Sequence, residues 1–234
     1  VIVGGGTAGW LTAATLAALP VACPAHPAPA TTAPVAPPAA APRAVPPAPN
    51  PRVRTARVGV LLCNLGTPSG TGYFAIRRYL GEFLGDRRIV ELPALLWQPI
   101  LQGIILSTRP FAKGKEYRAI WNTERDESPL LTITRDTADG VRRRLAERSE
   151  RVLVDFAMRY GVPSTRSRVE ALARAGCDRI LVVPLYPQYS ATTVASACDA
   201  VFDVLKGMRW QPALRVAPPW YDAPAYIDAL AASY

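Results

Sequence analysis

The chain has 234 residues, of which 50% are hydrophobic, so one large domain or two small ones can form around a buried core. Its formal net charge is +9, and because lysine occurs only at Lys113, Lys115 and Lys206, the positive charge is almost entirely arginine. No DNA- or RNA-reading motif accompanies this charge, so we expect no nucleic-acid partner, and no apolar run is long and clean enough to span a membrane.

The first residues of the chain contain a glycine fingerprint. Gly4, Gly6 and Gly9 match the pattern G-x-G-x-x-G, in which a strand, a tight turn and a helix start bring the backbone close to a pyrophosphate. The stretch 1–18 is similar to the FAD-binding start of flavin-dependent tryptophan halogenases. These three glycines are therefore the candidate residues for an FAD site.

The fingerprint is not followed by the rest of a nucleotide-binding unit. A helix over 12–19 runs into Pro20, and no second strand with a ribose-binding acid follows, although a βαβ unit needs ~30 residues. Residues 1–19 are therefore predicted to be an orphan strand–helix fragment. A working FAD site is one alternative. A secretory signal ahead of Cys23 is another, although the basic n-region of such signals is missing.

Residues 20–56 are predicted to be a disordered linker rich in alanine and proline. Arg43 is the only charged side chain before Arg52, and no apolar periodicity interrupts the prolines. Such a composition favours an extended polyproline II conformation without a core. The only histidine of the chain, His26, lies in this linker, where we expect it to serve neither as a metal ligand nor as a base.

From residue 57 onward, strand and helix patterns alternate. Strands are predicted at 58–62, 152–158, 180–185 and 214–217, and helices at 76–84, 93–106, 116–121, 128–145, 164–175, 194–208 and 224–234. Pro99 should bend or break the second of these helices. The alternation predicts an α/β fold with a doubly wound, mostly parallel sheet.

In such a sheet, ligands bind beyond the carboxyl ends of the strands. The loops predicted at those ends are 64–70, 159–163 and 186–190, which makes them the candidate binding loops. Cys63 and Cys177 lie in or beside apolar strand patterns, and we expect both to be buried free thiols, which favours a reducing compartment.

Six short motifs of this part of the chain resemble the ferrochelatase family. They lie at 58–68, 76–84, 117–121, 127–130, 157–161 and 184–190, and the stretch 121–129 is most similar to the proteobacterial form. The resemblance covers residues 57–234. It implies the class II chelatase fold, in which two flavodoxin-like halves enclose a porphyrin cleft. This chain corresponds to the first half only, so 57–234 is predicted to be an N-terminal domain truncated before the second half.

The resemblance also implies which residues bind the porphyrin. They are Leu65, Arg109, Tyr117, Ser128, Arg159 and Tyr160. A porphyrin is a flat apolar disc with two propionates, so arginines and hydroxyls can orient the carboxylates, while Leu65, Tyr160 and Tyr189 can pack on the disc. Local alternatives are open, because Arg109 could be a surface cation, Ser128 a helix cap and Tyr189 a core residue.

The activity implied by the resemblance is insertion of ferrous iron into a porphyrin, either protoporphyrin or coproporphyrin, in haem biosynthesis. The family's catalytic histidine belongs to the second half and would follow Tyr234, so we expect the chain as given to contain no catalytic residue and to be inactive. Ala191 stands where some relatives place an iron–sulfur ligand, so we expect no cluster and no other cofactor, ferrous iron being a substrate.

Three alternatives to this function follow from the same residues. The first is a non-catalytic module that binds a tetrapyrrole, and the second is a flavoprotein built on the glycine fingerprint. The third is a cobalt- or sirohydrochlorin-type chelatase, a class that usually lacks the Pro-Gln-Tyr-Ser and Ser-Pro motifs found here.

The apolar stretch 92–106 has two interpretations. It is either a lip that contacts a membrane surface or an ordinary buried helix pair. We expect a cytoplasmic location, peripheral to the inner membrane if the lip forms.

Overall fold

The computed structural model describes residues 56–233. The glycine fingerprint and almost all of the predicted linker lie outside these residues. The strands are β1 (Arg57–Thr67), β2 (Val152–Gly161), β3 (Cys177–Pro184) and β4 (Ala213–Val216). The helices are α2 (Tyr73–Leu84), α3 (Ala94–Ile100), α4 (Leu106–Ile120), α5 (Pro129–Ala146), α6 (Thr165–Arg174), α7 (Ser196–Lys206) and α8 (Pro224–Ala231), together with the π-helical segments η2 (Leu101–Ile105) and η3 (Ala191–Ala195).

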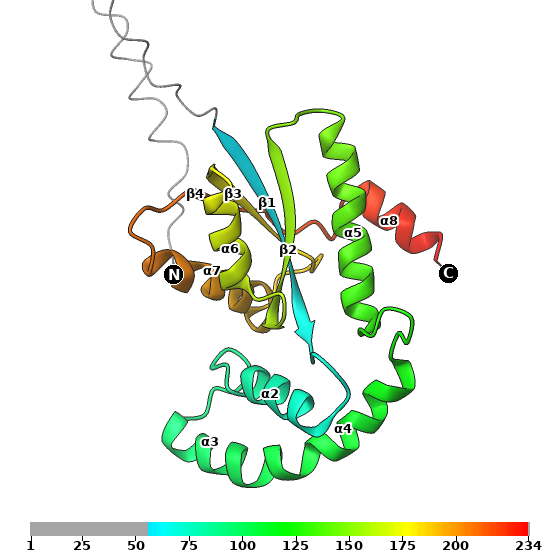
Figure 1. The fold of residues 1–234 in the computed structure, drawn as a ribbon, viewed down its shortest axis with the longest axis vertical. Helices are drawn as coiled ribbons and strands as arrows, with labels where there is room; N and C mark the ends of the chain where they lie inside the picture. Colours follow the sequence, from blue (N-terminus) through cyan, green and yellow to red (C-terminus); the bar gives the residue numbers. More distant parts are fainter. Residues whose placement is uncertain (1–55, 234) are drawn as a thin grey trace, which may run out of the picture. The chain divides into compact units, whose positions relative to one another are not determined.

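The four strands form one parallel sheet in the order β2-β1-β3-β4. Helices α6 and α7 pack on one face, and α5 covers the other face over β1 and β2 (Figure 1). Because β1 is central and covered on both faces, its sequence is apolar without alternation, and Leu61, Leu62 and Cys63 are all buried. The predicted α/β class and doubly wound sheet are confirmed, and this strand order is the flavodoxin-like one.

Two strands are longer than the sequence predicts. β1 continues through Thr67 and β2 through Gly161, because the register pairs Gly66 with Tyr160 and Thr67 with Gly161. Gly66 adopts φ +114°, and a Cβ atom there would collide with the carbonyl oxygen of Tyr160. The predicted loops at 64–70 and 159–163 were therefore wrong in their first residues, since Leu65, Arg159 and Tyr160 belong to strands.

Beyond the carboxyl end of β1, the segments α3, η2 and α4 form one curved run, which we call the helical arc (Figure 1). Pro99 lies inside α3 without ending it, and the π-helical turns of η2 follow directly. Curvature at a proline next to a π-helical segment is a common arrangement. The separate helix predicted at 116–121 was wrong, because residues 116–120 are the end of α4 and Trp121 follows it in an extended conformation.

The helical arc is packed on one side only. Leu101 and Leu106 are buried against Ile76 and Tyr79 of α2, and the indole nitrogen of Trp97 donates a hydrogen bond to the carbonyl oxygen of Leu84 at 2.7 Å. The other side exposes large apolar residues, namely Leu95, Leu96, Ile100, Ile104 and Phe111, and Leu92 just before α3 is also exposed. The arc is therefore more than a buried helix pair. None of the helices within 56–233 combines the length and the apolarity needed to cross a membrane.

Side-chain hydrogen bonds fix the N-terminal ends of α5 and α6 and one edge of the sheet. Ser128 caps α5 by accepting a hydrogen bond from Leu131 N at 3.2 Å, and Ser164 caps α6 in the same way by accepting from Ser167 N. At the outer strand of the sheet, the Arg142 guanidinium donates a hydrogen bond from Nη2 to the carbonyl oxygen of Val154 at 3.0 Å. Cys63 and Cys177 are buried free thiols, as expected.

Candidate functional site

The carboxyl ends of the parallel strands meet the region of α2 and the helical arc. Leu65 near the end of β1 and Tyr160 near the end of β2 both belong to the apolar cluster that α2 and the arc form. Tyr117 of α4 joins the same cluster. The structure thus brings together three of the seven residues predicted to bind a porphyrin, from three different elements.

A hollow of about 500 Å³ opens between α2 and α4. It is lined by Tyr79, Leu80, Phe83, Lys113, Glu116, Tyr117 and Ile120. Its floor is aromatic and apolar, and its two charged residues form an ion pair of 2.6 Å between Lys113 and Glu116. Phe83 connects this hollow to the strand tips, because its ring makes an edge-to-face contact with Tyr160 at 5.3 Å between centroids. The hollow suits a flat apolar ligand better than a highly charged one.

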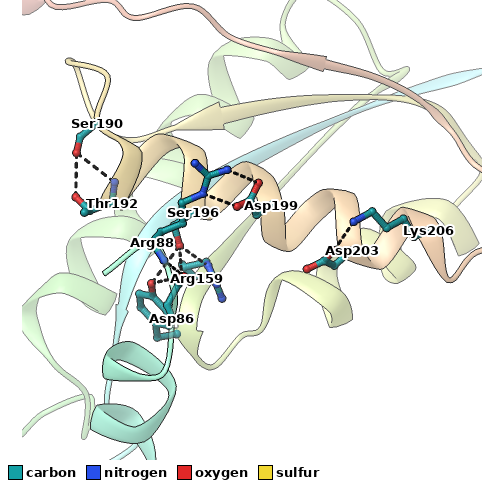
Figure 2. A network of polar contacts seen from close by, with 10 residues as sticks. Asp86, Arg88, Arg159, Ser190, Thr192, Ser196, Asp199, Asp203 and Lys206 are labelled. Carbon is teal, nitrogen blue, oxygen red and sulfur yellow. Dashed lines mark hydrogen bonds and ion pairs between the residues drawn. The ribbon is translucent and has the colours of Figure 1, made fainter. Parts of the chain in front are cut away.

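A buried polar cluster lies at the same strand tips and consists of Asp86, Arg159, Tyr160 and Ser196, which we call the Asp86 cluster (Figure 2). Oδ2 of Asp86 accepts hydrogen bonds from Arg159 Nη2 at 2.6 Å, from Tyr160 OH at 2.7 Å and from Ser196 Oγ at 2.5 Å. Arg159 also donates from Nε to Ser196 Oγ at 2.8 Å, and its guanidinium lies 4.6 Å from the Tyr160 ring centre.

The protonation states of the Asp86 cluster follow from these contacts. Burial alone would raise the pKa of Asp86, but hydrogen bonds from Ser196, Tyr160 and the Arg88 backbone, together with the charge of Arg159, hold that pKa below its usual value. Burial raises the pKa of the Tyr160 phenol to about 12. At neutral pH, Asp86 is therefore ionised and Tyr160 keeps its proton.

Two further contacts attach the segment around α2 to the sheet layer. Arg88 forms an exposed ion pair with Asp199 of α7, with Nε and Oδ2 2.7 Å apart (Figure 2). Gly161 donates its backbone N–H to Glu82 Oε2 at 2.8 Å. The end of α2 and the residues that follow it are thus connected to both β2 and α7.

Arg109, Ser128 and Tyr189 make no hydrogen bond or ion pair with the Asp86 cluster. Arg109 is exposed on α4, and Tyr189 is 62% exposed in the loop after β3, so the core alternative for Tyr189 was wrong. Ser128 is 2% exposed and its hydroxyl caps α5, which confirms the helix-cap interpretation. Tyr160 is 1% exposed, so its ring offers no surface to a ligand in this structure.

Sequence reasoning missed three residues at the strand tips. Asp86 and Ser196 are 110 positions apart, and neither belongs to a local motif, so only the fold brings them together. Tyr186 lies in a predicted binding loop, but Tyr189 was chosen instead. Burial raises the pKa of the Tyr186 phenol, and Tyr160 and Arg159 lie close enough to influence it. The apolar strand before it was the available signal, because residues just beyond the tip of a buried strand are expected to be half-buried.

These features define a doubly wound α/β domain with an arginine–tyrosine pair at its strand tips and an apolar hollow between α2 and α4. The model of the family described as Ferrochelatase matches residues 57–234, and the chain belongs to the ferrochelatase family. The resemblance noted from the six motifs is therefore confirmed.

Curated relatives agree with this assignment. A ferrochelatase of Bradyrhizobium sp. is 57% identical over 185 residues, which cover 79% of this chain and 52% of the relative. A ferrochelatase of Rhizobium meliloti is 55% identical over 79% of this chain and 54% of its own length, and one of Nitrobacter hamburgensis is 58% identical over 76% and 51%. The chain spans about half the length of the curated relatives it matches.

Proposed function

We propose that residues 57–234 form the porphyrin-binding wall of a ferrochelatase, whose substrates are ferrous iron and a porphyrin. The observation that carries this proposal is the position of Arg159 and Tyr160. They lie at the carboxyl end of β2, where the Tyr160 ring contacts Phe83, a residue that lines the hollow between α2 and α4. An apolar hollow accommodates the disc, while the cations of Arg109 and Arg159 are the groups that can hold propionates.

The same residues argue that these 234 residues alone do not insert the metal. Metalation needs a base that takes the pyrrole protons. No histidine occurs after His26. Burial raises the pKa of the phenols of Tyr79, Tyr160 and Tyr186, so they remain protonated at neutral pH. The Asp86 carboxylate is occupied by four hydrogen bonds and is poorly suited to accept another proton.

We propose further that the chain holds no iron–sulfur cluster. Ala191, the first residue of η3, presents a methyl group that cannot bind iron where a cluster ligand would stand. The exposed apolar side chains of the helical arc support peripheral contact with a membrane surface, in a cytoplasmic setting. The side of the arc that faces α2 is buried, so the exposed side is free to meet lipid without unfolding.

Absorbance titration of the purified chain with deuteroporphyrin, a dicarboxylic porphyrin, tests the proposed site. Arg109→Ala should weaken binding about tenfold, because one charge-assisted hydrogen bond is lost. Arg118→Ala is the matched control, since it removes an exposed arginine from the opposite side of the same helix, nine residues on. Equal affinities of the wild type and Arg109→Ala would contradict the proposed pose.

A second assay tests metalation. Zn²⁺ added to the porphyrin-loaded chain should remain uninserted, as read from the unchanged visible bands of the free-base porphyrin. Insertion at an enzymatic rate would overturn the proposal that this chain is inactive. A module that evolved only to bind a tetrapyrrole is not favoured, because the matched relatives are ferrochelatases.

A further inference from the structure

Asp86 collects donors from three separate parts of the chain. Its Oδ2 atom accepts from Arg159 and Tyr160 of β2 and from Ser196 at the start of α7, and its Oδ1 atom accepts from the backbone N–H of Arg88 at 2.7 Å. The side chain is 7% exposed. A buried carboxylate with four donors is held in one orientation, and it holds its donors in turn.

The Asp86 cluster leaves one part of Arg159 unused. Nε donates to Ser196 and Nη2 donates to Asp86, whereas Nη1 has no hydrogen-bond or ion-pair partner among residues 56–233. The Arg159 side chain is 23% exposed, so the guanidinium is not sealed off. A guanidinium is planar, and fixing two of its nitrogens also fixes the direction of the third.

We propose that Asp86 is a positioning residue for carboxylate binding: it orients Arg159 so that Nη1 meets a propionate of the bound tetrapyrrole. This inference rests on the proposed function. Asp86 itself does not touch the ligand. Ser196 assists it by holding Nε of the same guanidinium, and Tyr160 shields the carboxylate on the side of the apolar cluster.

Positioning and simple charge attraction predict opposite results for Asp86→Asn. Asp86 neutralises the charge of Arg159, so on Coulomb attraction alone its removal should tighten the binding of an anionic ligand. The amide of asparagine has only one acceptor oxygen, so its NH₂ group must face either the donors of Arg159, Tyr160 and Ser196 or the backbone N–H of Arg88, and in both orientations the charge that holds the guanidinium is gone. On the positioning proposal, the guanidinium loses its fixed direction and binding weakens.

The chain offers a matched control for the connection between α7 and the residues that follow α2. Arg88 and Asp199 form an exposed ion pair two residues away from Asp86, with side chains 43% and 40% exposed. Asp199→Asn makes the same chemical change and loosens the same connection to α7. It leaves the contacts of Arg159 intact, because Asp199 is not among the partners of that guanidinium.

The experiment titrates the full chain with deuteroporphyrin and, in the same dilute detergent, with its dimethyl ester, which carries no carboxylate. Asp86→Asn should weaken deuteroporphyrin binding roughly tenfold and leave ester binding within about twofold. Ser196→Ala should weaken deuteroporphyrin binding roughly threefold, and Asp199→Asn should change neither ligand's affinity. In an Arg159→Ala background, Asp86→Asn should have no further effect, because the two residues act through one contact.

The outcomes separate this inference from the function on which it rests. If the wild type does not bind deuteroporphyrin, or if Arg159→Ala does not weaken binding, the proposed site is wrong and the role of Asp86 with it. If Arg159→Ala weakens binding while Asp86→Asn tightens it or leaves it unchanged, only the positioning role is overturned. Equal losses for deuteroporphyrin and the ester would mean a general structural defect and would also overturn it. Should Asp86→Asn not fold, Ser196→Ala with both ligands decides the question.

Discussion

The sheet layer and the helical arc are stabilised in different ways. In the sheet layer, helices cover both faces of β1, and residues such as Leu61 and Val182 are completely buried. The helical arc buries only its inner side, and the Asp86 cluster connects the segment after α2 to β2 and α7. The apolar core therefore determines the fold, whereas polar contacts of defined geometry determine the arrangement of the strand-tip site.

The largest expected loss of stability comes from the sheet layer. Leu61→Ala should lower the free energy of unfolding by about 2–5 kcal/mol, because it leaves a cavity in a core without solvent access. Urea denaturation of the full chain, followed through the unfolding of residues 57–234, measures this change. Leu95→Ala, which removes the same atoms from a side chain that is 87% exposed, is the control. Equal losses for the two variants would contradict the comparison.

The Asp86 cluster should contribute less than the core, but measurably. Tyr160→Phe removes one donor from Asp86 and should lower the free energy of unfolding by about 1–2 kcal/mol, since the buried carboxylate loses a hydrogen bond. Tyr221→Phe, at a tyrosine that is 51% exposed, should change stability by less than about 0.5 kcal/mol. A Tyr160→Phe variant as stable as the wild type would mean that the cluster does not help to hold the two regions together.

The pH dependence of stability should show the same cluster. The pKa of Asp86 is lowered in the folded state, so its contribution is complete above the pKa of an unfolded aspartate, about 3.9. The contribution is lost as the pH falls from there through the lower folded-state value. The stability difference between wild type and Asp86→Asn should therefore shrink below about pH 4. Thermal unfolding of both proteins between pH 6 and pH 2.5 measures this, and a constant difference would contradict it.

The smallest effect on stability belongs to the outer side of the helical arc. Leu95→Ser should change the free energy of unfolding by less than about 0.5 kcal/mol, because the side chain is already exposed. It should nevertheless reduce cosedimentation with vesicles of phosphatidylglycerol and phosphatidylcholine. Ile133→Ser, at an exposed residue of α5, is the matched control. Unchanged vesicle binding by Leu95→Ser would argue against membrane contact through 92–106.

Sequence reasoning predicted the sheet layer well because its signals are local. The apolar runs of β1 and β3 and the serine caps of α5 and α6 each occupy a few consecutive residues. It failed where the outcome depends on distant partners. The extension of β1 to Thr67 is fixed by its pairing with Gly161, which no local pattern of β1 contains.

The candidate site shows the same division. Arg159 and Tyr160 were found through a short motif, whereas their partners Asp86 and Ser196 come from parts of the chain that carry no motif. The burial of Tyr160 was missed for the same reason, because α2 and Phe83 cover its ring from far away in the sequence.

The contact between Arg142 and the carbonyl oxygen of Val154 has a consequence for association between molecules. β2 is the outer strand of the sheet, and its free backbone groups are the place where a strand of another molecule could add. One of its acceptors is already bound by a guanidinium, and the charged arginine side chain lies along that edge. Fibril-like stacking through β2 is thereby disfavoured, even for a chain that exposes many apolar side chains elsewhere.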